Sequence, residues 1–313
     1  MKVLFYGTPE FALPTLEALL RHHRVVAVVT QPDRPAHRGQ RLTPPPVKER
    51  AEAAGVPVLQ PARVRDPGWP ERLRAFAPEV AVVVAFGQIL PKAVLDVPPR
   101  GSINVHASLL PRYRGAAPIA WAIIRGERVT GISTFLMDEG LDTGPILLQS
   151  APGAIGPDET AGELAARLAR LGAEVLTETL ARLDTLTPRP QRHDEATAAP
   201  RLKKSDGHLD WNRPTRQLVD MIRGCNPWPG ALTTSPAGRL IVWRARAVDV
   251  GPLSPPGRLS LHDGELVIPA ADGAVLPFEV QPENKRRMTW AEYLRGARLA
   301  AGAQLRSPAS TEP

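Results

Sequence analysis

Cysteine is almost absent from the chain. Cys225 is the only one in 313 residues, which excludes an internal disulfide and any metal site with several cysteine ligands. Long apolar runs are also missing, because no stretch approaches the roughly 18–20 residues that a membrane-spanning helix requires. The first residues lack the charged, apolar and cleavage regions of a signal peptide. We therefore expect a cytoplasmic protein with no membrane partner.

Two common catalytic motifs are missing as well. No G-x-S-x-G motif occurs, so a serine hydrolase is not expected. Gly7, Thr8 and Pro9 lack the G-x-G-x-x-G spacing of a dinucleotide site, and we expect Thr8 to cap a helix that begins at Pro9. His22 and His23 are adjacent in sequence and cannot converge on one ion. No metal cofactor is expected.

Lysine is scarce, because 33 of the 39 basic residues are arginine. The chain nevertheless carries a net charge of +7 and has an isoelectric point near 10. Such a balance permits a polyanionic partner without requiring one, so the distribution of the charge matters more than its sum. We expect no DNA partner.

Length and apolar pattern predict two domains. Residues 1–189 alternate near-continuous apolar runs with helical patterns, which is typical of a doubly wound, Rossmann-like α/β fold with a mostly parallel sheet. We expect its strands at residues 2–6, 25–30, 56–59, 80–85, 102–105 and 131–136. We expect its helices at residues 9–21, 46–54, 67–77, 116–125 and 159–183, the last with Asp158 as its N-cap.

The rest of the chain predicts a linker and a second, smaller domain. Prolines interrupt the pattern between residues 187 and 200, and we assign residues 190–206 to a basic linker. Residues 207–313 contain short apolar runs separated by turns, which favour a small OB-like β-barrel with a closing helix at 289–299. We expect its strands at 239–248, 257–261, 265–268 and 274–280, and a mobile tail from Ala300.

Asn104 and His106 are the most informative residues of the chain. They lie two positions apart at the end of an apolar run, so in a strand both side chains share one face. Asp142 follows another apolar run, in a turn rich in glycine and aspartate. In a parallel sheet, ligands bind beyond the carboxyl ends of the strands, where all three residues fall. An amide donor, a titratable base and a carboxylate suit acyl or formyl transfer.

Several longer motifs resemble those of the folate-dependent formyltransferases. The motifs that carry this resemblance are Asn104-Val105-His106 and residues 108–111, 114–119 and 138–144. Residues 7–11, 31–35 and 226–230 are similar to motifs in the branch of that family that formylates methionyl initiator tRNA. The similarity runs from about residue 2 to about residue 299.

The resemblance implies that an α-amine attacks the formyl carbon carried on N10 of 10-formyltetrahydrofolate. Asn104 and His106 would stabilise the oxyanion, His106 would also move a proton, and Asp142 would orient the imidazole. The strand geometry independently supports only the pairing of the first two. The folate-contacting residues implied by the resemblance are Ser108, Leu109, Leu110 and Pro111, together with Phe86, Gly87, Gln88, Ile89 and Leu90 of the pterin pocket.

A basic insertion at residues 33–50 leaves the carboxyl end of the second expected strand. Its glycine and three successive prolines predict a loop without regular structure over most of its length, and such a loop in a compact domain is usually functional. The resemblance implies that it contacts the acceptor stem of the initiator tRNA, with Arg38 as its most important residue. The expected tRNA contacts are Arg34, Arg38, Arg41 and Lys48 in the insertion, and Arg201, Lys203 and Lys204 in the linker.

At two positions we do not expect an aromatic ring to stack on an RNA base. Ala198 stands where an aromatic residue is common in the family, so no stacking is expected there. For Trp228, packing in a core or hinge is favoured over base stacking.

Three other functions remain open at this stage. A glycinamide ribonucleotide formyltransferase shares the Asn-His-Asp arrangement but lacks the insertion and the barrel. A sugar-nucleotide formyltransferase is disfavoured by the basic insertion. A non-catalytic RNA-binding protein has no need of Asn104, His106, Asp142 and the folate loop together.

Overall fold

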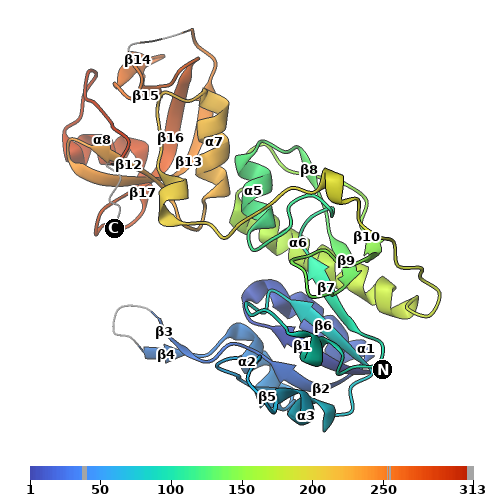
Figure 1. The fold of residues 1–313 in the computed structure, drawn as a ribbon. Helices are drawn as coiled ribbons and strands as arrows, with labels where there is room; N and C mark the ends of the chain where they lie inside the picture. The colour runs from blue at the N-terminus through green and yellow to red at the C-terminus, as the bar shows by residue number, and fades with distance from the viewer. Residues whose placement is uncertain (37–40, 252, 254, 309–313) are drawn as a thin grey trace. The chain divides into compact units, whose positions relative to one another are not determined.

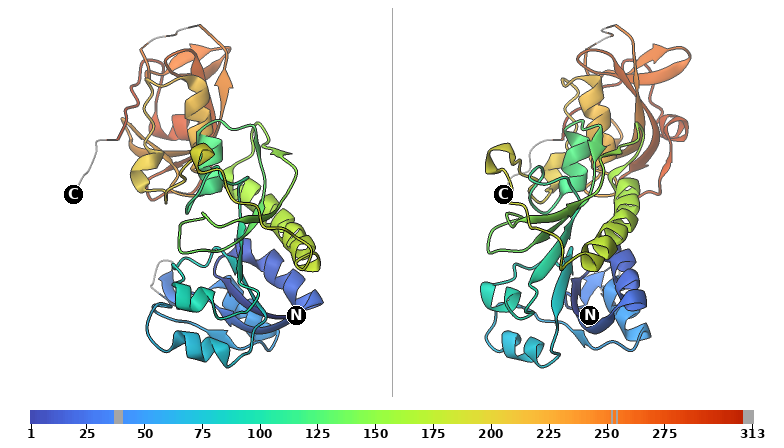
Figure 2. Two further views of the ribbon diagram at one scale, coloured as in Figure 1. Left: turned by 45° about the vertical axis from the view of Figure 1, so that its right-hand side comes forward. Right: turned by 90° about the vertical axis from the view of Figure 1, so that its right-hand side faces the viewer.

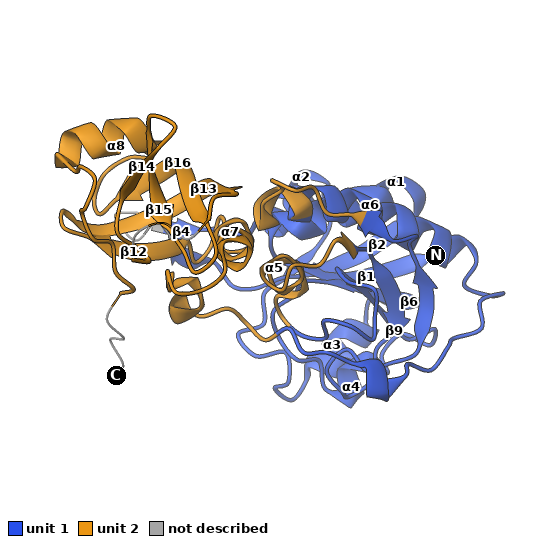
Figure 3. Ribbon diagram, turned by 90° about the horizontal axis from the view of Figure 1, so that it is seen from above, with its two compact units in different colours: residues 1–115, 130–153, 165–199 blue, residues 116–129, 154–164, 200–313 orange. Residues whose placement is uncertain are grey.

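The computed structural model describes residues 1–36, 41–251, 253 and 255–308, drawn as a ribbon in Figure 1. It divides the chain into two compact units, which Figure 3 colours separately. The first unit comprises residues 1–115, 130–153 and 165–199, and the second comprises 116–129, 154–164 and the chain from residue 200 onwards. The boundaries expected at residues 189 and 206 stay a prediction. None of the described helices is long and apolar enough to cross a membrane.

The first unit is built on a seven-stranded sheet. Five neighbouring strands are parallel, and β9 then pairs antiparallel with both β7 and β10, so the expected mostly parallel sheet is confirmed. β10 was not expected from the sequence. The order across the sheet is β10 (Ile146–Gln149), β9 (Ser133–Leu136), β7 (Ser102–His106), β6 (Val80–Val84), β1 (Lys2–Gly7), β2 (Arg24–Val29) and β5 (Val58–Leu59).

Helices cover both faces of this sheet, as Figure 2 shows, which explains why its strands are apolar along their whole length. On one face, Leu73 and Val94 from two short helices share a buried cluster with Val83 of β6. On the other face, a side chain at Gly172 would lie 3.0 Å from Val105 of β7. The helices are α1 (Leu13–His22), α2 (Pro46–Ala53), α3 (Trp69–Arg74), α4 (Lys92–Leu95), α5 (Pro118–Ile124) and α6 (Ala161–Ala181), with α5 in the second unit.

Two expected helix caps are wrong. A 3₁₀ turn, η1 (Glu10–Ala12), precedes α1, and the hydroxyl of Thr8 donates to the carbonyl oxygen of Phe86 instead of capping a helix. At the start of α6, the cap is Thr160 and not Asp158. The Thr160 hydroxyl accepts from the backbone N–H of Glu163, and the Glu163 carboxylate accepts from the backbone N–H of Thr160. The error at α6 arises because Asp158, Glu159 and Thr160 are all polar and precede the helix, whereas at α1 no side chain caps the helix at all.

Glu163 should make the stability of the second unit depend on pH. The backbone N–H of Thr160, the side chain of Arg244 and the Thr160 hydroxyl lower the pKa of Glu163 to about 2. Because this pKa is below the usual 4.5, the carboxylate stabilises the folded state above about pH 4.5, and the contribution is lost as the pH falls toward 2. We expect Glu163→Gln to lower the melting temperature at pH 7 and the difference to close between pH 4.5 and 2, in thermal unfolding measured over a pH series.

Glu174→Gln is the matched control, because Glu174 is an exposed residue of the same helix. Its melting temperature should follow that of the unaltered chain at every pH. If the loss in Glu163→Gln persisted unchanged below pH 3, the carboxylate would not be the source of the stability.

The basic insertion has regular structure, contrary to expectation. β3 (Arg34–Ala36) and β4 (Arg41–Thr43) pair antiparallel as a two-stranded ribbon, and α2 begins soon afterwards at Pro46. Both strands of such a ribbon are edge strands, which is where a proline such as Pro35 is tolerated. Residues 37–40 lie outside the described residues, and with them the expected contact Arg38.

The second unit contains an antiparallel sheet, as expected, together with α7 (Thr215–Gly224) and β12, which were not expected. The expected closing helix is α8 (Trp290–Ala297). The strands, in sheet order, are β12 (Ala231–Ser235), β13 (Gly238–Val248), β16 (Ala274–Pro282), β15 (Glu265–Pro269) and β14 (Ser260–His262), with β17 (Met288–Thr289) paired to β16. Short elements elsewhere are β8 (Val129–Thr130), β11 (Gly153–Ala154), η2 (His193–Glu195) and η3 (Lys204–Gly207).

Residues 302–306 close this sheet into a barrel, so the expectation of a mobile tail from Ala300 is wrong for this segment, while residues 309–313 lie outside the described residues. Thr234 of β12 exchanges two backbone hydrogen bonds with Arg306, at 2.8 and 2.9 Å. On the other side of the segment, Leu259 exchanges two with residues 302 and 303, at 2.7 and 2.8 Å. Leu305, between these pairings, is 1% exposed and belongs to the core of the unit.

Candidate active site

The strand β7 places Asn104 and His106 on one face, as their spacing predicted. β7 lies between β6 and β9, and its carboxyl end is at the edge of the sheet where the other parallel strands also end. Asn104 is partly exposed, and its side-chain amide makes no hydrogen bond to any residue that the structure describes. That amide is therefore available to donate to a bound molecule.

The imidazole of His106 is held by a backbone carbonyl. Its Nε2 lies 2.8 Å from the carbonyl oxygen of Tyr113 and, because a carbonyl only accepts, must donate to it. Its Nδ1 lies 3.7 Å from Oδ2 of Asp142. This separation suits an ion pair but exceeds a hydrogen bond, so Tyr113 fixes the ring more directly than the expected Asp142 does. A proton arriving on Nδ1 would face the carboxylate.

Asp142 is fixed by the loop that follows β7. Its Oδ2 accepts a hydrogen bond from the backbone N–H of Gly115 at 2.7 Å, and its backbone adopts a left-handed conformation with φ of +55°. The side chains of His106 and Asp142 are only 7% and 12% exposed. The structure thus brings the three expected catalytic residues to one edge of the sheet and buries the histidine–carboxylate pair.

The two expected folate segments leave adjacent parallel strands, so they begin at the same edge of the sheet. In the first, Phe86 is buried and packs edge-on against Tyr6, with ring centroids 5.3 Å apart. The Phe86 carbonyl accepts from the Thr8 hydroxyl at 2.9 Å and from the Gln31 side chain at 3.1 Å. Thr8 and Gln31 were not assigned to the site, although each lies within two residues of the end of a parallel strand, which was the available signal.

In the second segment, residues 108–111, polar side chains of the antiparallel strands β9 and β10 fix the backbone. The Ser133 hydroxyl donates to the Ser108 carbonyl at 2.7 Å and accepts from the backbone N–H of Leu110 at 3.0 Å. Gln149 donates to the carbonyl of Leu110 at 2.9 Å. Ser108 and Leu110 are buried, and Leu109 and Pro111 are partly exposed.

The remaining expected pocket residues are not equivalent. Gln88 donates to the carbonyl of Pro61 and accepts from the N–H of Val64, so its side chain holds a neighbouring loop. Ile89 is 84% exposed. Gly87 has a φ of +85°, a conformation that favours glycine, and Leu90 is buried. Of the residues in this segment, Phe86 and Leu90 are those with buried apolar side chains.

The expected tRNA contacts differ in their exposure and in whether a carboxylate already pairs with them. Arg34 is exposed, whereas Lys48 forms an ion pair with Asp33 at 2.7 Å and is largely covered. Arg41 lies on β4. In the second unit, all three expected basic residues are exposed, namely Arg201, Lys203 and Lys204.

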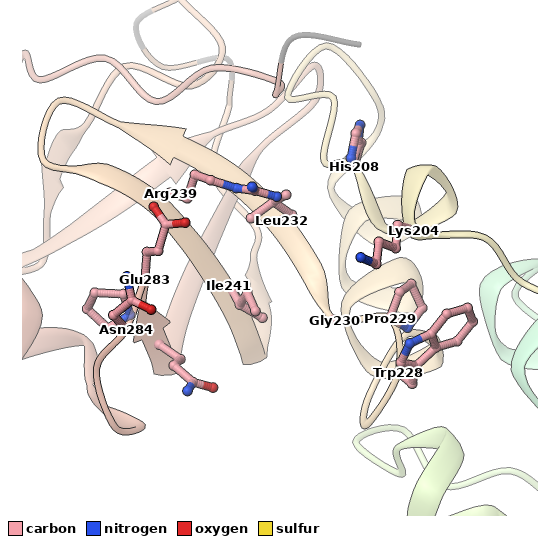
Figure 4. A pocket seen from close by; sticks show the side chains of 12 residues that line it. Lys204, His208, Trp228, Pro229, Gly230, Leu232, Arg239, Ile241, Glu283 and Asn284 are labelled. Atoms are coloured by element: carbon pink, nitrogen blue, oxygen red, sulfur yellow. The ribbon is translucent and has the colours of Figure 1, made fainter. Parts of the chain in front are cut away.

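Trp228 lines an open groove of about 350 Å³ in the second unit, so packing in a core is wrong, and packing at a hinge stays a prediction. Half of its surface is exposed, at 50%. Figure 4 shows Trp228 and Lys204 on one side of this groove, and Arg239 and Glu283 on the other. The groove therefore combines an exposed aromatic face with basic side chains.

Family models match nearly the whole chain. Residues 1–180 match the model of the formyl transferase family, and residues 201–298 match that of the formyl transferase C-terminal domain. The fold and the site thus define an enzyme of the formyl transferase class. A methionyl-tRNA formyltransferase of Pelobacter propionicus is 51% identical over 99% of this chain and 98% of its own length. The chain belongs to the methionyl-tRNA formyltransferase family.

Solved structures share the fold at low sequence identity. The N-formyltransferase from Helicobacter canadensis in complex with folinic acid and dTDP-3-aminofucose has a TM-score of 0.65 at 16% identity, covering 88% of this chain and 98% of that one. HypX from Aquifex aeolicus in complex with tetrahydrofolic acid has a TM-score of 0.63 at 16% identity, covering 96% of this chain and 48% of that one. These likenesses show the fold alone.

Proposed function

We propose that the protein transfers the formyl group of 10-formyltetrahydrofolate to the amino group of methionyl initiator tRNA. The observation that carries the proposal is the free amide of Asn104 beside the buried pair of His106 and Asp142, at the strand edge where both expected folate segments begin. The full-length identity to a methionyl-tRNA formyltransferase supports the choice of acceptor. A folate donor is further supported by the folate ligands of the two related structures.

The protein holds the folate segments in place before a donor binds. Phe86 and Leu90 anchor the first segment in the core, where they are 2% and 3% exposed, and the hydrogen bonds of Ser133 and Gln149 hold the backbone of the second segment. An apolar pocket with a few fixed polar groups is the usual form of such a site. When bound, the folate supplies the formyl group that is transferred.

The residues of the site then have distinct tasks. Asn104 donates to the formyl oxygen as negative charge develops there, a contribution worth about 3–4 kcal/mol for one well-placed donor. Because Nε2 of His106 is committed to the Tyr113 carbonyl, Nδ1 is the nitrogen left to take the proton of the incoming amine and to return it to N10 as the bond between N10 and the formyl carbon breaks. Asp142, 3.7 Å from Nδ1, stabilises that proton by its charge.

The acceptor can be tested directly. The purified protein would be incubated with 10-formyltetrahydrofolate and, in parallel, with methionyl initiator tRNA, glycinamide ribonucleotide or an amino-sugar nucleotide. Of the three acceptors, we expect only the tRNA to give formylated product. Product with either small acceptor and none with the tRNA would replace the proposed function by that of another formyltransferase. Binding of tRNA without product would favour a non-catalytic RNA-binding protein.

Six basic residues are proposed to hold the tRNA, namely Arg34, Arg38, Arg41, Arg201, Lys203 and Lys204, and of these Arg34, Arg201, Lys203 and Lys204 are exposed. Lys48 is a weaker candidate than the sequence suggested, because Asp33 already neutralises it. In the second unit, Trp228 offers an aromatic face in the groove that Lys204 and Arg239 also line. A base stacked on such a ring contributes about 1–3 kcal/mol.

We expect Trp228→Ala to raise the Michaelis constant for tRNA at least about fivefold, with no change in that for folate. Lys204→Ala should weaken tRNA binding more uniformly and reduce the slope of log K against log salt by about one. Lys2→Ala is the matched control, because Lys2 lies at the amino end of β1, whereas the candidate active site lies at the carboxyl ends of the parallel strands. Steady-state kinetics and binding at several salt concentrations would decide. Unaltered tRNA kinetics in Trp228→Ala would remove the groove from the interface.

A further inference from the structure

The segment of residues 189–199 lies along the active site and not merely between two domains. Arg189 exchanges two backbone hydrogen bonds with Ile146, both at 2.8 Å. Further along, Thr197 accepts from the backbone N–H groups of Tyr113 and Arg114, each at 2.8 Å. The segment is thus bonded both to the strand after the Asp142 loop and to the loop that holds His106.

Gln191 joins these two loops through its side chain. Its Nε2 donates to the carbonyl oxygens of Asp142 and Gly144, at 2.8 and 2.7 Å. Its Oε1 accepts from Nε and Nη2 of Arg114, at 3.1 and 2.7 Å. The residue is 6% exposed, and both ends of its amide are fully used.

The relative position of the two loops sets the distance between the catalytic groups. One loop carries the Tyr113 carbonyl that holds His106, and the other carries Asp142 in a left-handed conformation. Besides Gln191, the hydrogen bond from Gly115 to the Asp142 carboxylate also spans the gap. A displacement of about 1 Å in a catalytic group can lower a rate about 100-fold.

We propose that Gln191, bonded to Arg114, is a positioning residue that holds the Asp142 loop in register with His106. It acts through Asp142 and does not touch the substrates. This inference rests on the proposed function for its assay, but the arrangement of hydrogen bonds that carries it does not depend on which amine is formylated.

Gln191→Leu tests the proposal, because it removes all four hydrogen bonds with little change in volume. We expect kcat to fall about 10- to 100-fold while the Michaelis constants for folate and tRNA stay within about threefold. Gln304→Leu is the matched control. That glutamine also donates to two backbone carbonyls, but in the second unit, so its loss should cost some stability and leave kcat unchanged.

A double-mutant cycle separates positioning from a structural role. If Gln191 acts through Asp142, Gln191→Leu should lower kcat by less than about threefold in a chain that already carries Asp142→Asn. Equal losses in both backgrounds would overturn the proposal. So would an unchanged kcat, or a rise confined to the Michaelis constant for tRNA, which would place the segment in the acceptor interface.

A second variant and a parallel assay of the unaltered chain complete the test. Should Gln191→Leu not fold, Thr197→Val removes only the hydroxyl that accepts from Tyr113, and the same non-additivity with Asp142→Asn is expected on a smaller scale. The unaltered chain is assayed beside each variant. If it formylates none of the acceptors tested, the proposed function fails, whereas loss of non-additivity in an active chain refutes only the role of Gln191.

Discussion

Asn104→Ala and His106→Ala are each expected to lower kcat for formyl transfer about 100- to 1000-fold. The melting temperature should change little in Asn104→Ala and fall in His106→Ala, which also removes a buried side chain bonded to the Tyr113 carbonyl. Asn104 has no hydrogen-bond partner among the described residues to lose, so its removal affects mainly the charge that develops on the formyl oxygen. For His106, the group lost is the nitrogen that takes the amine proton. Both interactions strengthen in the transition state, so the loss should appear in kcat more than in either Michaelis constant.

Single-turnover kinetics with enzyme in excess would measure this loss without interference from product release. Asn212→Ala is a useful control, because it removes an exposed asparagine in the second unit whose side chain bonds only its neighbour Asp210. Near-normal turnover in a folded His106→Ala chain would show that another group moves the proton, and the assignment of the site would then be wrong.

Leu305→Ala is expected to destabilise the second unit by about 2–5 kcal/mol, the usual cost of truncating a fully buried leucine. The residue is 1% exposed and sits in the segment that closes the barrel. Removing the chain from residue 302 onwards should be more severe, because it also leaves backbone groups of Thr234 and Leu259 without partners. Denaturant unfolding, followed by tryptophan fluorescence, would measure both changes.

Leu261→Ala provides the comparison within the same unit. Leu261 is 66% exposed, so its replacement should change the free energy of unfolding by no more than about 0.5 kcal/mol. Equal stabilities for Leu305→Ala and Leu261→Ala would mean that residues 302–306 contribute nothing to the barrel, as a mobile tail would.

The parallel sheet and the Asn104–His106 pair could be predicted because both depend on short-range patterns. Strands covered on both faces are apolar throughout, and a spacing of two residues places side chains on one face of a strand. The residues that hold His106 and Asp142 in place could not be predicted in this way. Tyr113 contributes a backbone carbonyl, which any residue type has, and Gln191 meets Asp142 across a separation of 49 residues.

The errors have similar physical causes. The glycine and the three prolines at 44–46 suggested an irregular loop, but β3 and β4 precede those prolines and pair with each other as a ribbon. Residues 302–306 suggested a tail because a single leucine among small and polar residues gives no periodic signal. In both cases pairing with a distant or neighbouring strand, and not local composition, decided the structure.

The closure of the barrel by residues 302–306 also fixes an order of events on the ribosome. β12 is made early in the second unit, yet its edge at Thr234 stays open until Arg306 has left the exit tunnel. The helix α5 also cannot complete its packing until α7 has been made. A side chain at Gly224 of α7 would lie 2.5 Å from Ile124, so the two helices pack closely. During synthesis, the face of α5 that packs on α7 therefore cannot be covered until residue 224 has been made.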